Sequence, residues 1–435
     1  MKLFVRRFFT VMTLAVFAFG LPAPALWADV APGDVIDKTN YQKIEGLVPD
    51  FILKWVKEGE LIMKIGKLDF DPTNKFFPKE ALDNWEANIG RYKIDEHNGI
   101  IDVKTGKPAR GIKGLPFTVI DPKDPAMPVK IMWNSQFSEF FLQGHTEETQ
   151  HWLNITRRGL EKTIVLDNLT TIFNPEESNI DFAQLTVFRK PFNLSGVGTL
   201  ALYPLYPLEN GIRYAYTPEL RRMKRLSHRV AGSEARFGTD FSPDDSWAGG
   251  PKTNIEEGVY RYIGEKEALV PYFSESSRKI EKNADGELEM GAAKSGMKIR
   301  VGFEEPSWTG APWHFMDIIW VKSKVWVIES KSTNPSYLYG PCEGWIEQGS
   351  LLHCYKRITD TGGNLWKGMY WPGDAIESTD GEFKVVRKSP CVEVDMKRDH
   401  ATAVCAAFRD GAYRKILAKS KATLFTKAGF AKFSK

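Results

Sequence analysis

Residues 337–358 read YLYGPCEGWIEQGSLLHCYKRI, and this stretch decides the fold class. Aromatic and β-branched residues are frequent on both sides of its middle, which is typical of β-strands. The middle, Glu347-Gln348-Gly349-Ser350, has the composition of a tight turn. The stretch therefore predicts a strand over 337–345, a turn at 347–350 and a returning antiparallel strand over 351–358.

The same alternation continues on both sides of this hairpin. Apolar residues alternate with other residues in 183–187, 212–216 and 299–303, and further aromatic or β-branched runs occupy 325–328 and 365–371. Turn signals such as Glu209-Asn210-Gly211 and Asp380-Gly381 separate the runs. Many short strands joined by tight turns predict a curved or barrel-like antiparallel sheet over residues 161–390.

Helical periodicity is found on the flanks of this region. Phe51, Ile52, Trp55 and Val56 recur at helical spacing after Pro49, and residues 81–89 repeat the pattern. We expect a third helix within 137–160, interrupted at Gly144. The prediction is one elaborated domain, 29–435, of the α+β class and mainly β. It has a mixed or helical part at 29–160, the sheet at 161–390 and a helical part at 391–435.

The first 28 residues have the layout of a secretory signal peptide. Lys2, Arg6 and Arg7 precede a 14-residue apolar run, 8–21, and the small residues of 22–28 follow. The alternative is a membrane anchor, but the run is shorter than the roughly 20 residues that a spanning helix needs. We expect cleavage after Ala28 and a periplasmic protein. The net charge of +4 falls to about +1 without this segment, which argues against nucleic-acid binding.

All four cysteines lie in the last quarter of the chain. An even number of cysteines in an oxidising compartment predicts disulfides, and four cysteines allow three pairings. A turn centred near Gln348 places Cys342 and Cys354 almost opposite each other, so we expect the pairs Cys342–Cys354 and Cys391–Cys405. Zinc is the weaker alternative, because the chain has no Cys-x-x-Cys pair.

The motifs of hydrolases are incomplete. The segment 194–198 lacks the first glycine of Gly-x-Ser-x-Gly, and the Ser-x-x-Lys and Lys-Thr-Gly matches at 276–279 and 104–106 occur in the reverse of the penicillin-binding order. We therefore predict no catalytic residue and no cofactor, and we expect a protein that is not an enzyme.

Two polar clusters contain residue types that bind metals. His145, Glu148 and His151 would share a broad face of a helix, and a metal-assisted periplasmic hydrolase is the alternative function. A solvated polar face is the favoured interpretation of these three residues. Asp240, Asp244 and Asp245 could suit calcium, but the glycine and terminal glutamate of an EF-hand loop are missing, which favours a turn and cap cluster. No metal site is predicted.

Aromatic residues are concentrated in the predicted sheet. Core packing is the ordinary role of each, but a curved sheet closed by helices can leave an apolar cavity, the usual form of a ligand site. The candidate cavity residues are Trp320, Trp326, Trp366 and Tyr370. The basic and apolar residues of 411–435 favour a helix that covers the sheet, and peripheral contact with a membrane is the alternative.

Several segments together resemble a family of bacterial periplasmic proteins known as domain of unknown function 1329, which is related to outer-membrane lipoprotein-sorting proteins. The family's Pro-x-x-Arg-Arg strand is similar to Pro218–Met223 with Arg225, and its acidic loop is similar to Gly238–Phe241 with Asp244-Asp245. The other similar segments are Tyr260–Tyr262 through Val270–Tyr272, Lys324–Glu329 and Gly363–Lys367. These segments occur in the same order as in the family, and together they span most of the mature chain.

The resemblance implies a half-open antiparallel barrel with helices as a lid, as in the LolA and LolB carriers, which hold acyl chains between sheet and lid. Family members are often encoded beside RND-type exporters. The expected function is therefore a periplasmic carrier or binding protein for a lipid or other hydrophobic molecule, with an exporter or outer-membrane protein as partner. A structural accessory subunit of an exporter is a further alternative.

Three arginines could meet an anionic head group at the mouth of such a cavity. They are Arg221, Arg222 and Arg225, although charge on a strand surface is the favoured explanation for them. One departure from the family pattern is Pro341-Cys342, where an unbroken strand is expected. Proline has no N–H to donate, so this strand should be bulged or lie at an edge.

Overall fold

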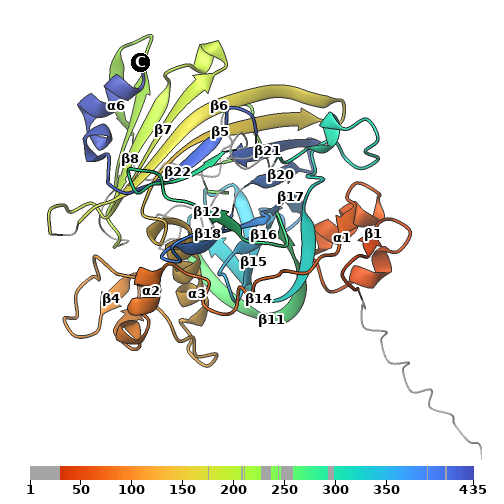
Figure 1. Ribbon diagram of the computed structural model, residues 1–435, viewed down its shortest axis with the longest axis horizontal. Helices are drawn as coiled ribbons and strands as arrows, with labels where there is room; N and C mark the ends of the chain where they lie inside the picture. The colour runs from red at the N-terminus through yellow and green to blue at the C-terminus, as the bar shows by residue number, and fades with distance from the viewer. Residues whose placement is uncertain are drawn as a thin grey trace, which may run out of the picture.

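The computed structural model describes residues 30–174, 176–206, 209, 211–226, 237–242, 244–245, 258–291, 298–388, 390–406 and 409–435. The described chain is mainly β, with a few short helices around the strands (Figure 1). The predicted signal peptide, 1–28, lies outside these ranges. Within them, no helix has the length and apolar character needed to cross a membrane.

The strands follow one another with few interruptions after residue 145. They are β1 (Val35–Ile36), β2 (Met63–Lys64), β3 (Tyr92–Ile94), β4 (Ile100–Asp102), β5 (His145–Thr156), β6 (Gly159–Ile172), β7 (Phe182–Lys190), β8 (Gly198–Tyr203), β9 (Ile212–Thr217), β10 (Arg222–Leu226), β11 (Gly258–Tyr272), β12 (Arg278–Ile280), β13 (Leu288–Gly291), β14 (Ile319–Ser332), β15 (Tyr339–Glu347), β16 (His353–Asp360), β17 (Leu365–Tyr370), β18 (Gly373–Ser378), β19 (Lys384–Lys388), β20 (Cys391–Asp395), β21 (His400–Ala406) and β22 (Tyr413–Leu417).

Most strands join one curved antiparallel sheet. Its order is β10-β9-β8-β7-β6-β5-β21-β20-β17-β16-β15-β14-β11. The first half of β5 pairs with β22 and its second half with β21, so β5 is the strand at which the sheet branches. In Figure 1 the long strands β5 and β6 arch over the top of the molecule, while β11 and β14 close its lower side.

The hairpin that opened the sequence argument is confirmed as β15 and β16. The turn lies between Glu347 and His353, and the strands end within two residues of the predicted limits. The register shifts between Tyr339 and Cys342, so the strand is bulged at Pro341 as expected from the missing proline N–H.

The helices are short and lie at several places around the sheet. They are α1 (Asp50–Lys57), α2 (Lys79–Asp83), α3 (Met127–Gln136) with the π-helical turn η3 (Phe137–Phe141), and α6 (Lys427–Phe433). The 3₁₀ turns are η1 (Tyr41–Ile44), η2 (Glu86–Asn88), η4 (Phe192–Leu194), η5 (Gly302–Glu304) and η6 (Ala422–Phe425). The apolar side of α1, with Phe51 and Trp55, packs into the main core beside Tyr355 and Tyr370. In contrast, η6 and α6 pack on β7–β9 through Phe425 and Phe430.

Three secondary-structure predictions were wrong. Residues 391–417 form β20, β21 and β22, so the helical part of 391–435 begins only at η6. The stretch 145–156 is β5 and not a helix, and the alternation in 299–303 leads into η5. The first two errors share a cause: charged residues such as Glu148 and Glu393 are buried, which hides the period of two from a count of apolar residues.

Candidate functional site

A cavity of about 360 Å³ lies against one face of β5–β9. Successive side chains of a strand point to opposite faces, so every second residue reaches the cavity. Those from β5–β9 are Glu148, Gln150, Trp152, Leu166, Asn168, Gln184, Thr186, Phe188, Thr199, Ala201, Tyr203, Arg213, Ala215 and Thr217. Gly198 and Tyr216 line the cavity as well, from intervening positions. Intervening residues such as Leu185 and Leu200 face the other way, towards η6 and α6. The volume is at the small end of the range of ligand pockets.

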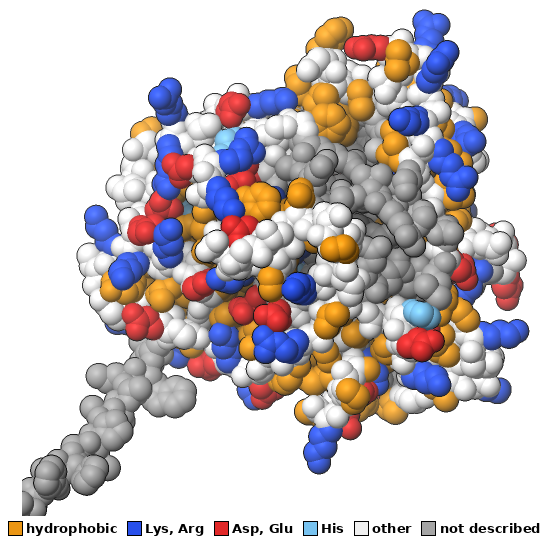
Figure 2. Space-filling view, turned by 180° about the vertical axis from the view of Figure 1, so that it is seen from behind, with side chains coloured by type: hydrophobic (Ala, Val, Ile, Leu, Met, Phe, Trp, Pro, Cys, Tyr) orange, Lys and Arg blue, Asp and Glu red, His pale blue; other side chains and the backbone are white. Residues whose placement is uncertain are grey.

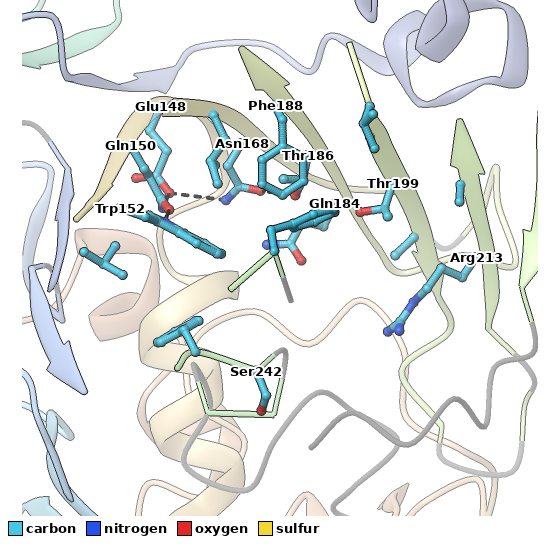
Figure 3. A pocket seen from close by; sticks show the side chains of 18 of the residues that line it. Glu148, Gln150, Trp152, Asn168, Gln184, Thr186, Phe188, Thr199, Arg213 and Ser242 are labelled. Atoms are coloured by element: carbon cyan, nitrogen blue, oxygen red, sulfur yellow. Dashed lines mark hydrogen bonds between the residues drawn. The ribbon is translucent and has the colours of Figure 1, made fainter. Parts of the chain in front are cut away.

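A row of hydrogen-bonded polar side chains crosses the wall of this cavity. Arg414 donates to Glu148 over 2.9 Å, and Glu148 accepts from Asn168 over 3.2 Å. Asn168 accepts in turn from Thr186 over 3.1 Å. Figure 3 shows Glu148, Asn168 and Thr186 side by side on neighbouring strands. Because its polar atoms bond one another, this row can be buried without a large desolvation penalty.

Charged groups line the cavity at two separate places. Glu139 of η3 and Lys388 of β19 both line it; burial raises the pKa of Glu139 and lowers the pKa of Lys388, and each charge partly offsets the shift of the other. Arg213 enters from β9, where its Nη2 donates to the Tyr203 hydroxyl over 2.9 Å (Figure 3). The cavity therefore offers a carboxyl group and cations beside the polar row.

The part of the cavity wall next to the polar row is aromatic (Figure 3). Trp152 meets Phe188 edge to face, with ring centroids 6.4 Å apart, and lies 5.4 Å from Phe241. Phe237 lies 4.6 Å from Phe188, and the Trp152 indole N–H is satisfied by Gln150 over 2.8 Å. Such a surface suits an apolar chain or ring, since every exposed face is carbon and the one donor is already bonded.

The loop that supplies Phe241 and Ser242 is held by buried ion pairs. Asp240 accepts hydrogen bonds from His400 over 2.5 Å and from Thr402 over 3.0 Å. Asp245 accepts from Lys367 over 3.3 Å. The carboxylates of this acidic cluster thus bond to residues of β17 and β21, and the one contact of the expected turn type is the Ser242 N–H that donates to Asp245 over 2.7 Å.

The ionisation of this loop depends on its cationic neighbours. Burial disfavours the charged form of Asp245, but the adjacent Lys367 and Lys356 outweigh it and lower the pKa of Asp245. Burial, with the nearby Asp245, raises the pKa of Glu393. The loop that carries Phe241 is thus attached to the sheet by buried ion pairs. Separating these charges inside the protein would cost much free energy.

The four aromatic residues selected from the sequence lie away from this cavity. Trp320 and Tyr370 belong to the main core, with ring centroids 5.6 Å apart. Trp326 packs on the α3 side of the sheet. Trp366 packs edge to face with Tyr339 and donates to Asp395 over 3.1 Å. The structure therefore brings Trp320 and Tyr370 together and separates them from Trp326 and Trp366.

The three candidate arginines lie at the β9–β10 hairpin. Arg221 occupies the turn, with φ of 46°, and all three side chains are exposed. Arg222 is opposite Thr217, on the cavity face of the sheet, whereas Arg225 is opposite Tyr214, on the other face. They do not form a single cluster, because neighbouring positions of a strand alternate in direction.

The three residues of the alternative metal site do not share one face. On β5, His145 and His151 share one face and Glu148 has the opposite one. Glu148 belongs to the polar row of the cavity, while His145 bonds Thr171 over 2.7 Å. Burial lowers the pKa of both histidines. Residues three apart lie on one side of a helix, but on a strand they point to opposite faces, which separates Glu148 from the two histidines.

The predicted disulfides are not present, and all four cysteines are buried free thiols. Cys342 is opposite Ile358, so Cys354 lies four positions along the strand, about 13 Å away at 3.3 Å per residue. Cys391 is opposite Val404, and the neighbouring Cys405 has the other face of the sheet. The hairpin was predicted correctly, but its register differs, because Ile346 is opposite His353 and the turn is therefore centred at Gly349-Ser350 and not near Gln348.

Most of the residues that line the cavity were not predicted from the sequence. Gln184 and Thr186 were recognised as the polar partners of an alternating strand, which ordinarily means the solvent side. Both instead face the cavity. The sequence does contain one indication of the cavity. All five strands β5–β9 carry polar residues on the same face, and such a face can line a cavity as well as contact solvent.

Comparison with known proteins identifies the family. The profile described as protein of unknown function (DUF1329) matches residues 35–429. No curated protein sequence matches the chain.

Solved structures with low similarity include three bacterial proteins. An outer membrane lipoprotein-sorting protein domain from Vibrio parahaemolyticus has 14% identity and a TM-score of 0.45, covering 69% of this chain and 97% of its own. A DUF1329 family protein from Desulfovibrio piger has 12% identity and a TM-score of 0.43, covering 66% and 91%. A LolA superfamily protein from Nitrosomonas europaea has 12% identity and a TM-score of 0.40, covering 69% and 98%. On the extent of the profile match, the chain belongs to the DUF1329 family.

Proposed function

We propose that this protein is a periplasmic carrier that binds a lipid or another hydrophobic molecule. The cavity of about 360 Å³ against β5–β9 carries the proposal, because it combines an aromatic part with a bonded polar row. Burial of an acyl chain at about 0.8 kcal/mol per methylene supplies affinity without a specific polar contact. The polar and charged part then orients one end of the ligand.

The cellular setting of the proposal rests on the sequence. The layout of residues 1–28 supports export to the periplasm, and the family resemblance supports a half-open barrel that transfers its ligand to or from an RND-type exporter or an outer-membrane protein. In this proposal the loop with Phe241 and the turn η3, which both line the cavity, take the part of the covering layer, and the protein has no catalytic role.

Native mass spectrometry of mature protein, purified from the periplasm without detergent, tests the proposal. We expect a discrete adduct that extracts into organic solvent as lipid. The substitution Ala215→Trp, which fills the cavity from β9, should abolish the adduct. Tyr214→Trp, on the next residue and the opposite face, should retain it.

Two outcomes would contradict the carrier proposal. One is a clean unliganded mass together with no uptake of fluorescent fatty acids or sterols; a stable complex with an exporter would then favour a structural subunit. The other is an adduct that survives Ala215→Trp as well as it survives Tyr214→Trp, since the ligand would then lie outside this cavity.

A further inference from the structure

Three segments far apart in the sequence meet at one end of the sheet. An added Cβ at Gly196, in the β7–β8 loop, would lie 2.7 Å from Pro218 of the β9–β10 turn and 2.4 Å from the carbonyl oxygen of Ser434. Arg189 strengthens the junction, because its Nη2 donates to the carbonyl of Phe433 over 3.0 Å. The two loops and the C-terminal segment therefore form one continuous surface.

Large apolar side chains project from this surface. Phe192 of η4 is 96% exposed and Leu220 of the β9–β10 turn is 66% exposed. Exposed apolar residues scattered singly are ordinary, but two on adjoining loops at the same tip form an apolar projection.

Cations surround these two residues. The exposed side chains of Lys190, Arg221, Arg222, Lys432 and Lys435 come from the same loops and the C-terminal segment. Glu219 is the one acidic residue in the stretches 190–197, 218–222 and 427–435. Within the part of the chain that the structure describes, none of the five cations forms a salt bridge. Figure 2 shows hydrophobic and cationic side chains projecting together at its upper right, where this end of the molecule lies.

The same end borders the cavity. Phe188, Val197, Gly198 and Thr217 line the cavity at the ends of β7, β8 and β9, directly behind the two projecting loops. Leu194, two residues after the exposed Phe192, packs inward with Phe188 and Val197. Within a few residues, the β7–β8 loop therefore connects the exposed Phe192 to Val197 in the cavity wall.

We propose that this end is a membrane-docking tip, formed by Phe192, Leu220 and the five cations, and that it binds an anionic phospholipid bilayer. The apolar side chains enter the boundary between head groups and acyl chains, and the cations meet the lipid phosphates. A protein partner with an acidic surface would suit the same cations, but it would leave the protein unbound to vesicles. The proposal does not depend on which molecule the cavity holds.

Vesicle flotation with the mature protein tests the tip. We expect binding to phosphatidylglycerol–phosphatidylcholine vesicles, weaker binding to phosphatidylcholine alone, and further weakening by salt. Phe192→Ser should lower the partition coefficient about tenfold, the effect of losing one buried aromatic side chain. The double variant Arg221→Gln/Arg222→Gln should lower it about fivefold for each charge removed.

Matched variants elsewhere keep the test specific. Val119→Ser removes another exposed apolar side chain, 61% exposed. Lys104→Gln/Lys107→Gln removes two exposed cations that follow β4, which lies at the lower left of Figure 1, well below α6 at the upper left. Both should bind vesicles like the wild type. The proposal is overturned if the protein binds no vesicles, or if it binds neutral and anionic vesicles equally. It is also overturned if the control variants weaken binding as much as the tip variants do.

Discussion

Lys367 shows how one side chain can hold a functional wall in place. Its ammonium donates to Glu393 over 2.7 Å, to Tyr339 over 2.9 Å and to the carbonyl of Asp240, and it lies 3.3 Å from Asp245. The neighbouring carboxylates outweigh burial and raise the pKa of Lys367, so it remains charged in the interior. A buried cation with several anionic and hydroxyl partners fixes the geometry of the loop that carries Phe241.

We expect Lys367→Met to destabilise the protein by about 3–5 kcal/mol, because it leaves Glu393 and Asp245 buried without their cation. Urea unfolding followed by tryptophan fluorescence measures the change. The control is Lys397→Met, which removes a largely exposed pair with Asp360 and should cost less than about 1 kcal/mol. Equal losses of unfolding free energy in the two variants would show that the buried Lys367 network stabilises the protein no more than an exposed ion pair does.

At the scale of elements, the sheet β5–β9 separates two different environments. Its cavity face carries the polar row and the aromatic cluster, and its other face carries the apolar residues that η6 and α6 cover. Phe430 of α6 is fully buried and meets Tyr216 with ring centroids 5.8 Å apart. The short C-terminal helix therefore stabilises the strands that form the cavity, although it lies on the far side of them.

Phe430→Ala should lower the free energy of unfolding by about 3–5 kcal/mol, the usual cost of deleting a buried phenylalanine side chain. Phe192→Ala makes the same chemical change at a position that is 96% exposed, and its effect should be within about 0.5 kcal/mol. Thermal unfolding of both variants gives the comparison. If Phe430→Ala unfolds like the wild type, α6 does not support the sheet.

Some of these elements could be predicted from the sequence and others could not. The hairpin at β15–β16, the bulge at Pro341 and the helix α1 could be predicted, because turn chemistry, the missing proline N–H and apolar spacing act locally. The cavity could not, because it depends on which faces of distant strands meet. Glu393 and Glu148 misled the prediction for the same reason: their partners, Lys367 and Arg414, are remote in sequence.

For the whole molecule, the cavity and the stability of the fold should be coupled. The lining residues come from β5–β10, β19–β22, η3 and the adjoining loops, so unfolding of the sheet destroys the site. A ligand that binds only the folded chain stabilises it by about 2.7 kcal/mol at a hundredfold excess over its Kd. Protein purified with its ligand should therefore unfold at a higher urea concentration than protein that has been unfolded, stripped of bound material and refolded.

Adding back the extracted lipid should restore the higher midpoint in the wild type but not in Ala215→Trp, whose cavity is filled. Tyr214→Trp should respond like the wild type, since that side chain is on the opposite face. Identical midpoints for loaded and stripped wild-type protein would contradict the coupling. A midpoint that rises equally in all three proteins would place the stabilising lipid on a surface such as the membrane-docking tip, because that surface is unchanged by both substitutions.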